Sequence, residues 1–149
     1  MVLTITVKMS YFSTENKQKL EQCFIHLLGE LPEIQEVKDF ETKTLVAENQ
    51  PISSIRNFFF IIRERKILDT VRKCAFIDEI NETVTFLLHK QALYVNKIAV
   101  ITSDTSSPLG NVQLTIKGGD PIEILNWIAP ETSEGEELVI QKFRDYQKL

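Results

Sequence analysis

Three separate segments of the chain alternate apolar and polar residues with a period of two. They are residues 2–9 (VLTITVKM), 83–89 (TVTFLLH) and 111–117 (NVQLTIK). Successive side chains of a strand point to opposite faces of a sheet, so this period is typical of strands with one buried and one polar face. Such a sheet needs a covering layer on its apolar face only. The pattern therefore predicts an α+β two-layer sandwich, a mainly antiparallel sheet with helices on one face.

Helical spacing of apolar residues predicts the layer that covers the sheet. In the first helix, Ser13 or Thr14 is the expected cap and Gly29 the expected stop. A second apolar stripe starts near residue 53 and continues to residue 75, with a bend near Arg65. In the sequence DPIE, Asp120 caps a third helix with proline at its first position, and a proline at residue 130 ends it.

The remaining segments carry weaker signals. Short strands are expected at residues 43–48 and within KIAVIT, and a turn is expected at DTSSPLG, residues 104–110. Trp127 lies beside an apolar stripe and is expected in the core. The tail, residues 131–149, is acidic and then amphipathic, which predicts a loosely docked helix.

Size and composition indicate one domain. The 149 residues are 43% apolar, enough for a single core over residues 1–149 with the C-terminal tail attached to it. The N-terminal segment alternates instead of resembling a signal peptide, and we expect a cytoplasmic protein without a membrane segment. Cys23 and Cys74 lack ligand spacing, which predicts reduced thiols and no metal.

Catalytic motifs are not evident. Gly118 and Gly119 precede a helix but no GK[ST] follows, which favours a helix cap over a phosphate loop. Neither His26 nor His89 has a serine or cysteine at a recognisable nucleophile spacing. We therefore expect no enzymatic activity and no cofactor, and a small hydrolase that uses His89 and Lys90 is the remaining catalytic alternative.

Basic residues are concentrated in the middle of this acidic chain. The net charge is −4, yet residues 51–100 contain eight basic and five acidic side chains. The segment RERKILDTVRK, residues 63–73, contains five of these basic side chains. Salt screens exposed charges beyond about 10 Å, so a local excess can attract a polyanion although the whole protein is acidic.

Four blocks of the chain carry a family resemblance: RERKILDTVRKC, FLLHKQALYVNK, SPLGNVQLTI and DPIEILNWIAPET. At these blocks the chain resembles a conserved archaeal family of uncharacterised proteins that are predicted to bind RNA and to associate with the exosome. The resemblance implies an α+β fold similar to that of the ribosomal protein that binds 5S RNA. It also implies a non-enzymatic RNA-binding role, through Arg63, Arg65, Lys66, Arg72, Lys73, His89, Lys90 and Gln91.

The segment HKQ, residues 89–91, leads to two structural expectations. The strand at residues 83–89 should end at His89 or turn Lys90 toward solvent, and the segment HKQ should line one anionic site with Arg63 or Arg72. The structural alternatives are a solvated helix face for the first block and a simple turn for the second.

The polar face of the sheet offers a further alternative. It should display Thr4, Thr6, Lys8, Thr83, Thr85, His89, Asn111, Gln113, Thr115 and Lys117. None is aromatic, which disfavours base stacking of the RRM kind. This face could serve as a homodimer surface or face water, and a protein-interaction subunit or homodimeric scaffold without RNA contact is the alternative function.

Overall fold

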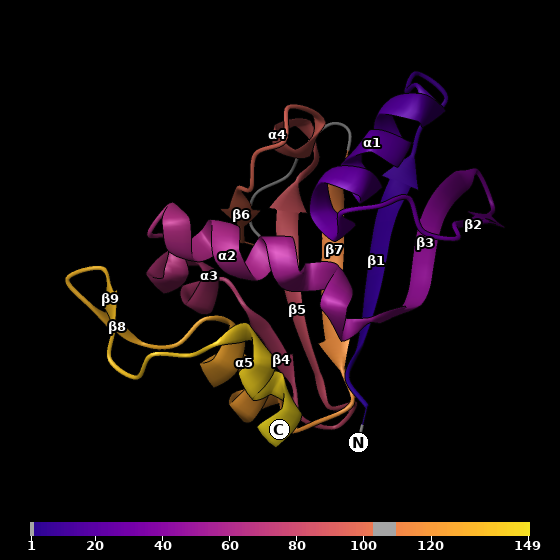
Figure 1. Ribbon diagram of the computed structural model, residues 1–149. Coiled ribbons are helices and arrows are strands. Elements are labelled where there is room, and N and C mark those ends of the chain that lie inside the picture. Colours follow the sequence, from indigo (N-terminus) through magenta and orange to yellow (C-terminus); the bar gives the residue numbers. More distant parts are fainter. Residues whose placement is uncertain (1, 103–109) are drawn as a thin grey trace.

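The computed structural model describes residues 2–102 and 110–149, and in this part of the chain an antiparallel sheet of seven strands carries its helices on one face (Figure 1). The strand order is β2-β3-β1-β7-β5-β4, and β6 also pairs with β5. The strands are β1 (Thr4–Tyr11), β2 (Gln35–Asp39), β3 (Thr42–Pro51), β4 (Phe76–Asp78), β5 (Thr83–His89), β6 (Val100–Ile101) and β7 (Asn111–Lys117). The predicted α+β class and antiparallel sheet are confirmed.

Helices and short elements complete the described chain. The α-helices are α1 (Lys17–Leu28), α2 (Arg56–Glu64), α3 (Leu68–Lys73), α4 (Lys90–Tyr94) and α5 (Pro121–Ile128). The 3₁₀ helices are η1 (Ile52–Ile55) and η2 (Phe143–Lys148), and a small hairpin consists of β8 (Thr132–Ser133) and β9 (Glu136–Glu137). Every described helix is too short or too polar to cross a membrane.

The three alternating segments form the adjacent strands β1, β7 and β5. Their apolar residues lie in register on the buried face, where Val7 pairs with Leu114 and Leu114 pairs with Phe86. Their polar residues form matching rows on the other face, such as Thr6, Thr115 and Thr85. The period of two therefore identified both faces correctly.

A β-bulge interrupts the pairing of β1 with β3. Ile5 pairs with Gln50 and Val7 pairs with Ala47, so β3 has one more residue in this interval than β1. Asn49 within the bulge has a positive φ of 53°. Bulges of this kind bend the strand and increase its local twist.

Helix ends agree with the sequence in part. Asp120 accepts hydrogen bonds from the N–H groups of Ile122 and Glu123, as predicted, and Gly29 ends α1 in the left-handed conformation. The predicted cap at Ser13 or Thr14 is wrong, because the side chain of Asn16 accepts from the N–H of Gln18. The turn expected at residues 104–110 lies largely outside the described residues.

The C-terminal tail docks more tightly than predicted. It forms the β8–β9 hairpin and then η2, where the side chain of Phe143 is only 8% exposed. The Phe143 ring lies 5.6 Å from that of Trp127 and 5.4 Å from that of Phe59. The indole N–H of Trp127 donates to the carbonyl of Lys142 at 3.0 Å. The predicted core position of Trp127 is confirmed, and the tail completes this aromatic cluster.

We predict that Phe143→Ala lowers the free energy of unfolding by about 3 kcal/mol, because it removes a large buried ring and leaves a cavity beside Trp127. Urea unfolding of both variants provides the measurement. Leu138→Ala in the same tail is the control, because that side chain is 61% exposed and its loss should cost less than about 0.5 kcal/mol. If Phe143→Ala and Leu138→Ala lower the free energy of unfolding by the same small amount, the tail does not dock on the core.

Candidate functional site

Arg63, the first residue of the predicted RNA site, points into the protein. Its guanidinium donates to the carbonyls of Phe59 and Ile128, both at 3.0 Å, and to that of Trp127 at 3.0 Å. The side chain is only 13% exposed and lies against the Phe59 ring. Burial lowers the pKa of Arg63, and the carboxylate of Glu137 at 3.4 Å opposes this shift. Arg63 therefore satisfies the carbonyls at the end of α5, as cations at helix C-termini do.

Arg72 contacts the same end of α5. Its guanidinium donates to the side-chain oxygen of Asn126 at 2.9 Å and to the carbonyl of Ala129 at 3.1 Å. It also lies 3.7 Å from the carboxylate of Glu131. Both arginines thus have partners within the chain, and an RNA phosphate would have to compete for their donors.

The other basic residues of the first block remain at the surface. Arg65, Lys66 and Lys73 are exposed, and neither Arg65 nor Lys66 forms an ion pair with a described residue. Lys73 lies 3.2 Å from Asp69 on the same helix. Lys66 shares a shallow surface depression with Asp69 and Glu134. Acidic side chains therefore accompany this basic surface, which reduces its attraction for a polyanion.

Lys90, in the second predicted block, is fully buried. The strand β5 ends at His89, which is the first of the two predicted outcomes, and Lys90 does not turn toward solvent. Its ammonium donates to the carbonyl of Ser10 at 2.7 Å and lies 3.2 Å from each carboxylate oxygen of Glu15. The Glu15 side chain is also buried, so the two form an ion pair shielded from water.

Other groups around the ion pair complete its hydrogen bonds. The carboxylate of Glu15 accepts from the hydroxyl of Tyr94 at 2.7 Å and from the backbone N–H of Phe12 at 3.0 Å. Burial lowers the pKa of Lys90 while Glu15 opposes the shift, and burial together with Glu15 raises the pKa of Tyr94. Burial also raises the pKa of the nearby Cys23 thiol to about 12. The cluster joins the end of β1 to α1 and α4, and its chemistry is that of a structural connection.

His89 and Gln91 complete the second block. The His89 ring accepts a hydrogen bond from the N–H of Ala92 at 3.2 Å and so caps α4. Gln91 is exposed. The predicted common site with Arg63 or Arg72 is not formed, because those arginines contact α5 whereas α4 lies at the other end of β5 (Figure 1).

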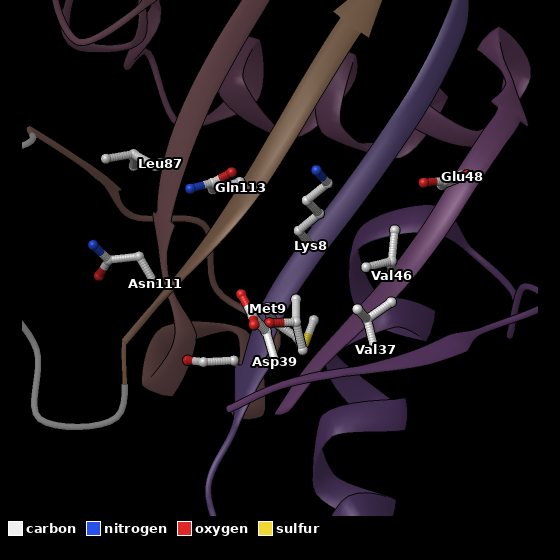
Figure 2. Close-up of a pocket in the computed structure, with 11 residues that line it drawn as sticks. Lys8, Met9, Val37, Asp39, Val46, Glu48, Leu87, Asn111 and Gln113 are labelled. Atoms are coloured by element: carbon white, nitrogen blue, oxygen red, sulfur yellow. The ribbon is translucent and has the colours of Figure 1, made fainter. Parts of the chain in front are cut away.

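The open face of the sheet contains a hollow that the sequence did not reveal (Figure 2). Its volume is about 680 Å³, and β1, β2, β3, β5 and β7 all contribute to it. The lining residues are Lys8, Met9, Ser10, Val37, Asp39, Thr44, Val46, Glu48, Leu87, Asn111 and Gln113. Lys8, Asn111 and Gln113 were expected on this face. Val37 and Asp39 were not, because no strand was predicted where β2 lies.

The hollow combines charged, amide and apolar groups. Two carboxylates, Asp39 and Glu48, accompany the single ammonium of Lys8. Val46 is buried although it lies on the open face. The side-chain oxygen of Asn111 is buried and accepts no hydrogen bond within the described structure. Buried acceptors normally have a donor, so this oxygen is a position where a bound molecule could donate.

Metal chemistry has no evident place in the described residues. No group of three or more histidine, cysteine, aspartate or glutamate side chains is arranged there to hold a metal ion. The glutamates of the C-terminal tail are therefore not gathered into a cation site.

These features define a small α+β protein with one helical layer and one open, hollowed sheet face. No family model matches the chain. A UPF0201 protein from Sulfurisphaera tokodaii is 34% identical over 131 residues, which cover 88% of this chain and 90% of that protein. A UPF0201 protein from Metallosphaera sedula is 37% identical over 102 residues, covering 68% and 71%. The chain therefore belongs to the archaeal UPF0201 family.

Solved structures show the same fold. The crystal structure of a UPF0201 protein from Methanococcus jannaschii has a TM-score of 0.75 at 21% identity, covering 91% of this chain and 98% of that one. A DUF54 protein from Methanothermobacter thermautotrophicus has a TM-score of 0.58 at 17% identity, covering 84% and 93%. At these identities the likeness concerns the fold.

We predict that Arg63→Ala lowers the free energy of unfolding by about 3 kcal/mol, because several buried carbonyls lose a charged donor. Arg63→Lys should restore little of this loss, since an ammonium cannot reproduce the forked geometry of the guanidinium. Urea unfolding measures both. Lys66→Ala is the control and should change stability by less than about 0.5 kcal/mol; a similar loss in Arg63→Ala and Lys66→Ala would contradict the buried role of Arg63.

The buried ion pair leads to a second stability prediction. Lys90→Met should cost about 3–5 kcal/mol, because the carboxylate of Glu15 stays buried without its cation. The double variant Lys90→Met with Glu15→Gln should cost less than the sum of the two single changes, with a coupling of about 1–3 kcal/mol. Thermal and urea unfolding of all four proteins measure this cycle. Strict additivity would show that the two side chains do not interact.

Proposed function

We propose that this protein is a non-enzymatic binding protein, and that the open sheet face binds an extended protein segment with basic and apolar side chains. The observation that carries the proposal is the hollow on this face, in which the buried oxygen of Asn111 accepts no hydrogen bond from any described residue. An extended segment offers backbone N–H groups and alternating side chains, which suit a shallow site across several strands.

The charges in the hollow favour a basic partner. Asp39 and Glu48 outnumber Lys8, and the chain as a whole has a net charge of −4. Potentials of opposite sign across an interface speed association and exclude wrong partners. An RNA phosphate entering the hollow would meet two carboxylates, whereas a lysine or arginine side chain would be attracted by them.

Apolar side chains supply the second part of the site. Val37, Val46 and Leu87 line the hollow and come from three different strands. Val37 is exposed, so apolar surface remains open to a partner. Burial of such surface contributes about 25 cal/mol per Å², while the surrounding polar groups set orientation and specificity.

RNA binding, within RNA processing or degradation machinery as the family resemblance implies, is the second candidate function. The observation that favours it is the exposed trio Arg65 and Lys66, in the turn between α2 and α3, and Lys73 at the end of α3. Because Arg63, Arg72 and Lys90 have internal partners, about three phosphates could be neutralised. Binding to single-stranded RNA should then fall with salt with a logarithmic slope near −2.

We predict that peptides selected on the purified chain from a random displayed library combine lysine or arginine with apolar residues. Fluorescence anisotropy then measures their affinity for the wild-type chain and for the double variant Asp39→Lys with Glu48→Lys. Reversal of these charges should weaken binding by about tenfold or more, which is about 1.4 kcal/mol. The matched control, Glu134→Lys with Glu136→Lys, makes the same change of charge on the distant β8–β9 hairpin and should bind normally.

The same assay with labelled RNA of mixed sequence separates the two candidates. Salt-sensitive RNA binding that is lost when Arg65, Lys66 and Lys73 are replaced by glutamate, and is kept in the hollow variant, would support the second candidate. The first candidate fails if no peptide is enriched, or if the hollow and hairpin variants weaken peptide binding equally.

A further inference from the structure

One edge of the sheet is unpaired in the described structure. The strand β2 pairs with β3 on one side and lies at the outer end of the strand order (Figure 1). All five of its residues are exposed. Apolar side chains accompany this edge, since Leu31 and Val37 are about half exposed and Phe40 is 93% exposed. An edge of this kind presents free N–H and C=O groups to another strand.

The hairpin geometry determines which backbone groups are free. β2 and β3 are joined by the two residues Phe40 and Glu41, and Asp39 pairs with Thr42. In a two-residue hairpin this closing pair exchanges hydrogen bonds, and bonded residues then alternate along the strand. Asp39, Val37 and Gln35 therefore direct their backbone groups to β3, and the backbone groups of Glu36 and Lys38 point outward.

This alternation restricts how two β2 strands can pair in antiparallel fashion. With two-fold symmetry the outward residues can meet in three ways: Glu36 opposite Glu36, Lys38 opposite Lys38, or Glu36 opposite Lys38. Like charges directly opposite each other destabilise a strand pair, and opposite charges stabilise it. The third register is therefore favoured, and symmetry forms its Glu36–Lys38 pair twice.

The favoured register also places apolar residues together. Val37 lies on the two-fold axis, opposite Val37 of the second copy. Such a non-hydrogen-bonded pair brings side chains closest together. The exposed Phe40 comes opposite Ile34 of the second copy. In each chain the Ile34 side chain is partly buried against the core. Among the described residues of one chain, Glu36 pairs with two exposed lysines, Lys17 at 3.7 Å and Lys43 at 3.5 Å.

We propose that two copies of this chain associate through β2 into one continuous antiparallel sheet. Charge complementarity of the strand with itself is the reason for choosing a second copy over another partner. The charged side chains of an edge can also protect it from pairing, but protection does not account for the apolar Val37 and Phe40 beside them. The proposal does not depend on the proposed function, although Val37 and Asp39 place the interface beside the hollow.

Light scattering after gel filtration, over a range of concentrations, tests this proposal. The wild-type chain should show twice the 17.2 kDa mass of one chain. Glu36→Lys places lysines opposite lysines, and Lys38→Glu places glutamates opposite glutamates, so each single variant should weaken dimerisation at least about tenfold. The exposed Glu33→Lys, outside the strand, is the charge control and should remain dimeric.

Two further samples make the test specific to the register. The double variant Glu36→Lys with Lys38→Glu restores opposite charges and should dimerise. A mixture of the two single variants should form a heterodimer, because lysines of one chain then face glutamates of the other. Circular dichroism confirms that each variant is folded. A monomeric wild type, single variants that dimerise normally, or a mixture that stays monomeric would each overturn the proposal.

Discussion

The pairing of β1 with β3 on one side and β7 on the other is the constraint on which the rest of the structure depends. It joins the first strand of the chain to the last long one, and it sets which face of the sheet each side chain occupies. Because Ile5, Val7 and Met9 all point to one face, the helices must cover that face. The other face keeps its rows of hydroxyl and amide groups, and any partner of the sheet has to meet them there.

Three cations of the basic middle segment, Arg63, Arg72 and Lys90, serve as internal connections. Arg63 and Arg72 hold the end of α5 against α2 and α3, while Lys90 holds the end of β1 against α4. Long basic side chains can reach carbonyl groups that the backbone itself leaves without partners, and they do so at the ends of elements. A local excess of basic residues in a sequence therefore does not translate directly into a basic surface, and the functional proposal rests on the open face instead.

Sequence patterns predicted the elements whose side chains repeat with a clear period. β1, β5, β7 and the helical stripe that includes Phe58 and Ile62 belong to this group. β2 was missed because all five of its residues are exposed, so no apolar period marks it. Lys90 was misplaced for a different reason: its partner Glu15 is 75 residues away, and residue type alone does not reveal a distant ion pair. The hollow escaped prediction because it needs both β2 and the correct pairing of five strands.

The bulge at Asn49 links the length of one strand to the orientation of a helix. Without its additional residue, the segment after it would be displaced by one position, and a displacement of one position exchanges the two faces of a strand. Leu45 and Ala47 lie before the bulge, and Ile52 and Ile55 follow it at the start of the helical layer, all buried. Insertions or deletions in this segment would therefore rotate the apolar side of α2 away from the sheet. Among related chains, the number of residues between the part of β3 that pairs with β1 and the start of α2 should vary less than the lengths of other loops.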